Sequence, residues 1–397
     1  MSSEWTRGKL GDFIELKRGY DLAQAVRVPG PFPLVSSAGV SDCHAEPKVK
    51  GPGVITGRYG TIGQVYFVEQ DFWPLNTTLY VRDFKGNFPR FISYFLKTVD
   101  FHAYSDKAAV PGLNRNHLHE ALALMPNLLI QQEIAATLGA LDDRITLLCE
   151  TNATLEAIAQ ALFKSWFVDF DPVRAKMEGR VPEGMDEATA ALFPDGFEES
   201  ELGLVPRGWR VRPLDEIATY LNGLALQKFP PSDDAWLPVI KIAQLRKGDT
   251  VGADRAGRNI KPEYVIQSGD VLFSWSGSLE VEVWCGGEGA LNQHLFKVSS
   301  ETYPKWFYYL WTKHHLAHFR QVAASKATTM GHIQRAHLTQ ALVVAPPDAF
   351  ISEVSQFFEP LLDRWIATAL QAQTLATLRD TLLPRLISGA LRLPETA

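Results

Sequence analysis

The sequence predicts an α+β protein: two β-rich mixed domains in a pseudo-twofold tandem repeat, separated by two long antiparallel coiled-coil helices. Three observations support this fold class. Words recur between the two halves of the chain, each half contains strand-like segments joined by glycine turns, and each half ends in a long heptad pattern.

Length and composition limit the number of domains and the class of protein. The 397 residues are enough for two or three domains, and 46% hydrophobic with 21% charged residues is typical of globular proteins. The three cysteines form no CxxC pair, and no apolar signal region opens the chain. We therefore expect a cytoplasmic protein without a membrane segment.

The repeat is visible in matching words. "GVITGRYGTIG" (53–63) resembles "DVLFSWSGSLE" (270–280), and "LNTTLYV" (75–81) matches "LNQHLFK" (291–297). Trp5 and Gly19 correspond to Trp209 and Gly223 at an offset of 204 residues. From "LNRNHL" (113–118) and "IQRAHL" (333–338) onward the offset is 220, without a gap, to the ends of the helices. The globular parts therefore tolerate insertions, whereas the helices keep their length.

Each half has the same predicted order. Strand-like segments such as "GQVYFVEQ" and "GDVLFSWSG" come first, and an aromatic helix follows, at 88–105 in the first half and 303–319 in the second. A segment rich in Pro, Gly and acids, with one short helix near 186–193, joins the halves. The predicted divisions are a first domain at 1–126, a helix at 127–169, a linker at 170–208, a second domain at 209–346 and a second helix at 347–397.

Both long helices carry a seam of mainly apolar residues in steps of four and three. At about 1.5 Å per residue, a helix over 131–168 is roughly 57 Å long. Two such helices in one chain are expected to pair antiparallel; an interface between copies of the chain is the alternative. The predicted seam consists of Leu138, Leu141, Ile145, Leu148, Asn152, Leu155, Leu162 and Trp166 in the first helix, and Phe358, Leu361, Trp365, Leu375 and Leu382 in the second.

Asn152 interrupts the first seam. A polar residue at such a position costs stability but fixes register. The alternative is that Asn152 faces solvent at a frayed part of the seam.

Charge is unevenly distributed along the chain. The net charge of −6 argues against a nucleic-acid binder. However, residues 302–347 contain no Asp or Glu, and they include Lys305, Lys313, Arg320, Lys326 and Arg335. This window predicts a local basic surface, unless it reflects chance and a buried helix.

Signatures of catalysis are missing from the sequence. There is no P-loop, HExxH, GxSxG or kinase motif, and "GRYGTIG" (57–63) lacks a βαβ context. His117 and His337 occupy equivalent repeat positions, where a capping or packing role is more common than a catalytic one. We expect a non-enzymatic chain that holds no metal or cofactor.

Nearly the whole chain resembles the specificity subunits of type I restriction–modification systems. The resemblance rests on the duplicated layout and on particular words: "LDDRITLLCETNATLEAIAQALFKSWFVDFDPVRAKMEGR" (141–180), "FPDGFEESELGLVPRGW" (193–209), "RYGTIGQVYF" (58–67), "LNQHLFKV" (291–298) and "ATTMGHIQRAHL" (327–338).

This resemblance implies a non-catalytic subunit with two target-recognition domains. Each would read one half of a split double-stranded DNA target, and the helices would act as a ruler and as a docking surface. It implies two modification subunits as partners, and restriction subunits recruited through them. S-adenosylmethionine, ATP and Mg would belong to those partners.

Candidate DNA-binding residues follow from the chemistry of phosphates and base edges. They lie at three repeat-equivalent places: the glycine turn, the LN word and the segment before "HL". In the first domain they are Arg58, Tyr59, Thr61, Asn76, Thr77, Lys107, Asn114 and Arg115. In the second they are Ser274, Trp275, Ser276, Gln293, His294, Lys326, Thr328, Thr329, His332, Gln334 and Arg335.

Two other functions stay open at this point. A degenerate DNA-modifying enzyme would need motifs that the sequence lacks. A protein-binding scaffold would not need the acid-free window with its Lys, His and Thr residues.

Overall fold

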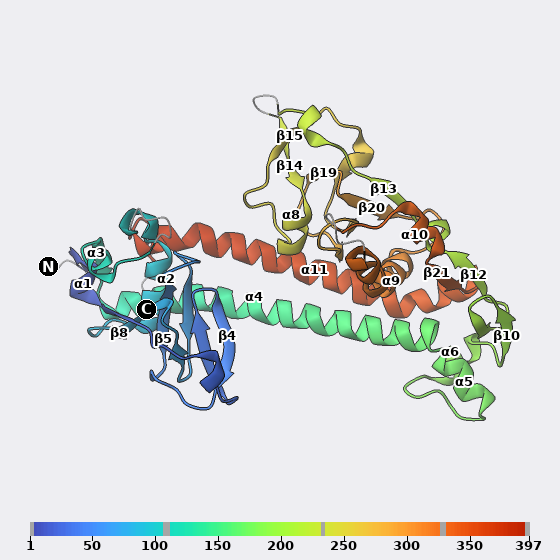
Figure 1. Ribbon diagram of the computed structural model, residues 1–397, viewed down its shortest axis with the longest axis horizontal. Helices are drawn as coiled ribbons and strands as arrows, with labels where there is room; N and C mark the ends of the chain where they lie inside the picture. The colour runs from blue at the N-terminus through green and yellow to red at the C-terminus, as the bar shows by residue number, and fades with distance from the viewer. Residues whose placement is uncertain (1–3, 106–111, 232–234, 326–330, 394–397) are drawn as a thin grey trace. The chain divides into compact units, whose positions relative to one another are not determined.

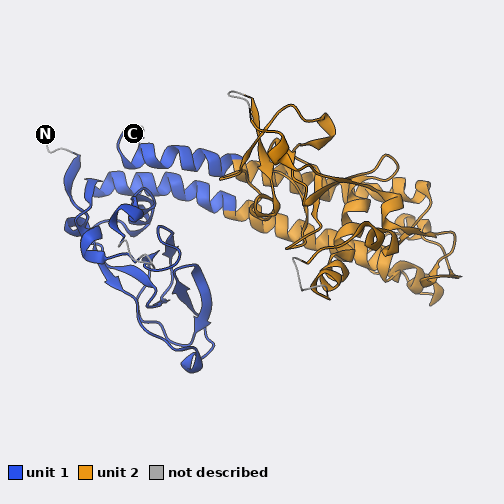
Figure 2. Ribbon diagram, turned by 45° about the horizontal axis from the view of Figure 1, so that its top comes forward, with its two compact units in different colours: residues 1–145, 374–397 blue, residues 146–373 orange. Residues whose placement is uncertain are grey.

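The computed structural model describes residues 4–105, 112–231, 235–325 and 331–393, and the chain divides into two compact units. Unit 1 comprises residues 1–145 and 374–397, and unit 2 comprises residues 146–373 (Figure 2). Each unit contains one globular domain and one stretch of each long helix, α4 (Leu128–Phe163) and α11 (Asp348–Ile387). None of the helices in the described ranges is both long and apolar enough to span a membrane.

The globular domain of unit 1 is built on two sheets. The larger is antiparallel, in the order β2 (Glu15–Arg18), β8 (Thr78–Asp83), β5 (Gly53–Gly57) and β6 (Val65–Val68). The smaller has the order β4 (Gly39–His44), β3 (Phe32–Ser36) and β7 (Trp73–Pro74). β1 (Trp5–Lys9) pairs with β9 (Leu122–Pro126), the strand that leads into α4. Helices α1 (Leu10–Phe13), α2 (Pro89–Lys97) and α3 (Arg115–His119) complete the domain (Figure 1).

Unit 2 repeats this order. Its first sheet runs β13 (Thr219–Asn222), β20 (Leu295–Ser299), β17 (Val271–Ser274) and β18 (Val281–Val283). Its second sheet runs β15 (Arg255–Gly257), β14 (Trp236–Ile240), β19 (Gly289–Leu291) and β16 (Val265–Ile266). β12 (Arg210–Pro213) pairs with β21 (Leu342–Ala345), the strand before α11. The helices are α7 (Leu214–Ile217), α8 (Ile242–Lys247), α9 (Lys305–Ser325) and α10 (Arg335–Gln340). The predicted α+β tandem repeat is confirmed.

One sequence match is out of register by a residue. "LNTTLYV" and "LNQHLFK" align Asn76 with Asn292, but the ladders pair Gly57 with Thr78 in β5–β8 and Ser274 with Leu295 in β17–β20. Because Gly57 and Ser274 are equivalent ends of equivalent strands, Thr78 corresponds to Leu295. The Leu-Asn word is therefore a coincidence, and the structural counterpart of Asn76 is Gln293.

The segment between the halves is a folded part of unit 2. The short helix expected near 186–193 corresponds to α6 (Glu187–Leu192). Two features were not predicted: α5 (Asp171–Met177), and the hairpin of β10 (Phe197–Ser200) with β11 (Gly203–Pro206). Phe170, Phe193 and Trp209 are buried in the main core of the unit. The Pro, Gly and acid content of this segment indicated a linker, so these well-spaced aromatic side chains were not predicted to be core residues.

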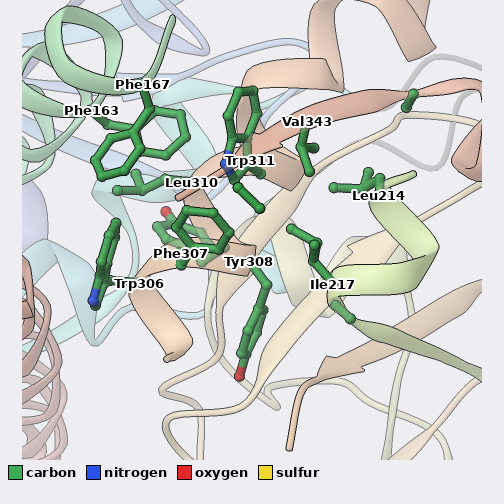
Figure 3. Close-up of a cluster of buried hydrophobic side chains, with 14 of the residues drawn as sticks. Phe163, Phe167, Leu214, Ile217, Trp306, Phe307, Tyr308, Leu310, Trp311 and Val343 are labelled. Atoms are coloured by element: carbon green, nitrogen blue, oxygen red, sulfur yellow. The ribbon is translucent and has the colours of Figure 1, made fainter. Parts of the chain in front are cut away.

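α4 ends in a wider, π-helical turn at Lys164–Val168. This turn brings Phe163 and Phe167 into the aromatic core of unit 2, where Phe163 stacks on Phe167 and meets Trp311 edge-on (Figure 3). Phe167 also contacts Trp306 at 5.6 Å between ring centroids. The end of the helix is thereby fixed to α9.

The two long helices run antiparallel and in contact within each unit. In unit 1, Asp142 pairs with Arg379; in unit 2, Asn152 meets Thr368 and Trp166 meets Phe358. None of the predicted seam residues is exposed. By contrast, Leu147, Ile158, Leu370 and Leu378 lie off the seam and are 37–51% exposed.

Asn152 has a partner across the seam. Its Oδ1 accepts a hydrogen bond from the hydroxyl of Thr368, a residue that is only 2% exposed. Thr368 also reaches the carbonyl of Arg364 at 2.8 Å in its own helix. This arrangement supports the register-fixing alternative and not the solvent-facing one.

Candidate nucleic-acid interface

A turn after β5 joins three distant segments of the first domain. The amide of Arg58 donates to the carbonyl of Thr77 at 2.8 Å, and the carbonyl of Arg58 accepts from the amide of Leu113 at 2.9 Å. Tyr59 forms a bridge with Gly112. Backbone hydrogen bonds therefore bring the three predicted places of the first domain together.

The same junction exists in the second domain. The amide of Trp275 donates to the carbonyl of His294 at 3.3 Å, and its carbonyl accepts from the amide of Ile333 at 3.0 Å. Ser276 forms a bridge with His332. Gly60 and Gly277 take left-handed backbone angles, φ 76° and 65°, so both turns need a residue without a β-carbon.

The first junction presents a cation and an aromatic ring. The Arg58 guanidinium lies 4.7 Å from the centre of the Tyr59 ring, and Tyr59 is 38% exposed. Thr77 Oγ1 accepts from the amide of Ser37 at 3.4 Å, and the Asn76 amide donates to Asp21. Arg and Asn are side chains that contact phosphates and base edges.

The remaining candidates of the first domain surround this junction. Thr61 is exposed in the turn. Asn114 begins α3 and accepts from the amide of Asn116 at 3.0 Å, and Arg115 is exposed on the first turn of that helix. Lys107 lies outside the described residues.

The second junction is a network of polar side chains. His294 Nδ1 lies 2.9 Å from the hydroxyl of Ser276, and its Nε2 lies 3.3 Å from the amide nitrogen of Gln293. The indole N–H of Trp275 donates to Asn222 Oδ1 at 3.0 Å and to the carbonyl of Gln293 at 3.2 Å. These contacts fix Gln293 and His294 beside the half-buried Trp275 ring.

Two of the predicted serines face inward. Ser274 is 0% exposed, and its hydroxyl donates to the carbonyl of Ser278 at 2.7 Å. Ser276 is 4% exposed and supports His294. In this conformation both serines hold the turn and offer no surface to a nucleic acid.

The segment before α10 contributes the last candidates. His332 lies 6.4 Å from Trp275, between ring centroids, and Gln334 is exposed. Arg335 donates to the carbonyl of Tyr220 at 3.2 Å and lies over the Phe296 ring. His337 accepts from the amide of Gln334 at 2.9 Å, which is the expected capping role. Lys326, Thr328 and Thr329 lie outside the described residues.

The acid-free window, residues 302–347, forms a less basic surface in the folded protein than its sequence indicates. Lys313 pairs with Glu156 and Glu282, and Arg320 pairs with Glu280 at 2.7 Å. All three acids lie outside residues 302–347. The prediction of a basic surface over this whole window is therefore wrong for these two residues, because long-range contacts neutralise them.

Asp21 and Asn222 belong to the junctions, although neither was predicted from the sequence. Asp21 binds Asn76, and Asn222 binds Trp275. Each lies within two residues of one of the matched glycines, Gly19 and Gly223, at or just after the end of an edge strand, β2 or β13. That matched glycine was the signal that could have identified them.

Among the described residues, no group of His, Cys, Asp and Glu side chains is arranged to hold a metal ion. Instead, the two domains share the same backbone hydrogen bonds at their junctions and carry different side chains there. Residues 2–157 and 206–363 match the family described as the type I restriction modification DNA specificity domain.

The chain belongs to this family of type I specificity subunits. It is 25% identical to the MjaIX specificity subunit of Methanocaldococcus jannaschii, over 91% of this chain and 82% of that protein. It is 24% identical to the HindI specificity subunit of Haemophilus influenzae, over 82% of this chain and 83% of that protein.

A solved structure supports the fold of this specificity subunit. The S subunit of a type I restriction–modification system from M. genitalium superposes with a TM-score of 0.56 at 15% identity. The superposition covers 99% of this chain and 97% of that one. The likeness therefore extends to both domains and both long helices.

Proposed function

We propose that this specificity subunit is non-catalytic and that each recognition domain reads one half of a bipartite double-stranded DNA target. The observation that carries the proposal is the duplicated junction. The backbone hydrogen bonds are repeated, whereas Arg58, Tyr59 and Thr77 are replaced by Trp275, Ser276 and His294. A constant frame with different side chains suits two readers of two different half-sites.

The paired helices would set the spacing between the half-sites. α4 and α11 are continuous over 36 and 40 residues, and the repeat offset stays at 220 along their length. Helix length fixes a distance at about 1.5 Å per residue. A target with a non-specific gap of fixed length follows from this property.

Direct base contacts are proposed for the polar side chains at each junction. Gln and Asn form paired hydrogen bonds with adenine, and Arg does so with guanine. Gln293 and Asn76 occupy equivalent positions, and Arg58 has no cationic counterpart in the second domain, where Trp275 takes its place. The two half-sites should therefore differ in sequence.

We also propose that two modification subunits dock on the helices and recruit restriction subunits. Ile158 and Leu378 are equivalent at the 220-residue offset, and they are 43% and 45% exposed. A matched apolar position on each helix suits two copies of one partner. S-adenosylmethionine, ATP and Mg would bind to those partners and not to this chain.

The test is to map methylated adenines on plasmid DNA after co-expression with a type I modification subunit that copurifies with this chain. A two-part motif with a constant gap is expected. Exchange of residues 270–335 for those of another specificity subunit should change only one part of the motif. A contiguous motif, or a change in both parts, would contradict two independent readers.

A further inference from the structure

Each recognition domain is attached to the long helices through a tyrosine at the same repeat position. Tyr94 lies on α2 and Tyr309 on α9, and they are 2% and 6% exposed. In unit 1 the Tyr94 hydroxyl donates to Asp142 Oδ2 on α4 at 2.5 Å. Asp142 Oδ1 accepts from Arg379 on α11 at 2.7 Å. One carboxylate therefore joins the recognition domain to both long helices.

Further polar contacts hold α2 in unit 1. Arg90 passes over Gly139, where a β-carbon would lie 2.9 Å from the guanidinium carbon, and donates to Asp143 at 2.6 Å. The buried Gln131 of α4 accepts from the amide of Phe88 at 2.8 Å, just before α2. These contacts fix both the rotation and the start of α2.

Asp142 is held in its charged form. Burial alone would raise the pKa of its carboxyl, but the hydrogen bonds from Tyr94 and Arg379, together with the positive charges of Lys97 and Arg379, outweigh burial, and the pKa is lowered. A charged acceptor with two directed donors has a narrow choice of geometries.

Unit 2 uses different residues to attach its domain to α4. The repeat places Leu362 where Asp142 would be and Ala159 where Arg379 would be. Lys313, one turn beyond Tyr309, donates to the Tyr309 hydroxyl at 3.1 Å and binds Glu156 on α4. It also lies 3.5 Å from Glu282 on β18. One ammonium group therefore joins α9, the sheet and α4.

Binding strength alone does not explain these clusters. Large apolar contacts already attach both domains, and partly buried ion pairs are weak evidence for stability. Apolar contacts are non-directional, whereas hydrogen bonds to charged groups define angles. The clusters are therefore suited to fix how each domain is oriented on its helices.

We propose that the Tyr94–Asp142–Arg379 cluster and the Lys313–Glu156–Glu282 cluster are positioning residues that set the spacer length this subunit accepts. This inference rests on the proposed reading of a bipartite target. One extra base pair adds about 3.4 Å and about one-tenth of a helical turn. To reject a target that is one base pair longer, the freedom of each domain to shift and rotate on its helices must be smaller than this displacement and rotation.

The test uses the full chain assembled with modification subunits and a DNA library in which the two half-sites are separated by the native gap or by one base pair more or less. Tyr94→Phe removes only the hydroxyl, and Lys313→Met removes the ammonium group, with its charge and its hydrogen-bond donors, from a side chain of similar length. Tyr308→Phe is the matched control, because Tyr308 is a buried tyrosine of α9 whose hydroxyl has no hydrogen-bond partner within the described ranges.

The wild-type complex and the Tyr308→Phe complex should methylate the native gap alone. Tyr94→Phe and Lys313→Met should raise methylation of the neighbouring gaps at least 10-fold, with unchanged base preference in each half-site. Gap selectivity retained by both variants would overturn the positioning role. If Lys313→Met fails to assemble, Tyr94→Phe decides alone. A wild-type complex that ignores the gap would instead refute the bipartite target itself.

Discussion

His315 shows how one half-buried side chain couples the second domain to pH. It is stacked on Trp311, and its Nε2–H donates to the carbonyl of Leu342 at 3.0 Å. Burial, with smaller effects from neighbouring charges, lowers the pKa of His315 to about 4. The folded domain therefore holds this ring neutral.

We expect stability of unit 2 to fall as pH drops from about 6.5 to about 4. The unfolded chain takes up a proton first, since its histidine pKa is higher, so the loss begins near 6.5 and ends below the folded pKa. The full effect is at most about 3 kcal/mol. Urea unfolding at several pH values measures it, and His315→Gln should remove this component, while His102→Gln, at an exposed position of unit 1, should not. An unchanged pH profile in His315→Gln would contradict the assignment.

Gln293 carries a second prediction at the scale of single residues. Its amide lies beside His294 at the second junction, and we propose that it contacts a base edge there. Gln293→Ala should weaken methylation of the correct target about 10- to 100-fold, since one paired contact to a base contributes about 1–3 kcal/mol. The loss should be confined to one half-site, as shown by targets altered in one half at a time. Gln356→Ala, an exposed glutamine on α11, is the control.

The helix pair depends on polar contacts that the apolar seam alone would not need. Replacing Asn152 by Leu and Thr368 by Val should raise the melting temperature by a few degrees, because a polar seam position costs stability. The same change should allow alternative helix pairings. Light scattering should then detect oligomers that the wild-type chain does not form at equal concentration. A destabilised monomer would contradict a register-fixing role.

The outer surface of the helices carries the prediction about partners. Ile158→Glu and Leu378→Glu each place a charge at one of the two equivalent exposed positions. Each single change should reduce bound modification subunits from two to one, and the double change should abolish binding, as measured by native mass spectrometry. Leu147→Glu, at an exposed position whose repeat counterpart is Ala367, tests whether the pairing of sites matters. Full stoichiometry in the double variant would place the docking surface elsewhere.

At the scale of the whole molecule, charge limits how the isolated chain can bind DNA. The net charge is −6, and the candidate interface offers five cations: Arg58, Lys107, Arg115, Lys326 and Arg335. Each phosphate contact adds about 0.9 to the salt slope. The isolated chain should therefore show a slope no steeper than about −4.5, and the assembled complex a steeper one. Fluorescence anisotropy between 50 and 200 mM salt checks this, and a steep slope for the chain alone would show that other cations bind phosphates.

What the sequence could predict depended on the range of the interactions. Heptads and turns are local patterns, so the long helices, the glycine turns at Gly60 and Gly277 and the order of the repeat were accessible. Lys313 pairs with Glu156, a residue 157 positions away, so the neutralisation of the Lys313 charge could not be predicted from local sequence. Asn222, whose partner Trp275 lies 53 positions away, was missed for the same reason. The Leu-Asn word aligned the two ladders one residue out of register, so it matched Asn76 to the wrong residue of the second domain.

Two polar contacts across the helix seam, Asn152–Thr368 and Asp142–Arg379, are not repeated by the duplication. At the 220-residue offset, Asn152 corresponds to Ala372 and Thr368 to Leu148, just as Asp142 corresponds to Leu362 and Arg379 to Ala159. A helix pair made from two copies of α4 would place Asn152 against Leu148 and Asp142 against Ala159. A pair made from two copies of α11 would likewise place Thr368 against Ala372 and Arg379 against Leu362. In these contacts the two helices are therefore not interchangeable. We expect a recognition domain exchanged with another such protein to keep its function only when the α4–α11 pair of this chain is retained.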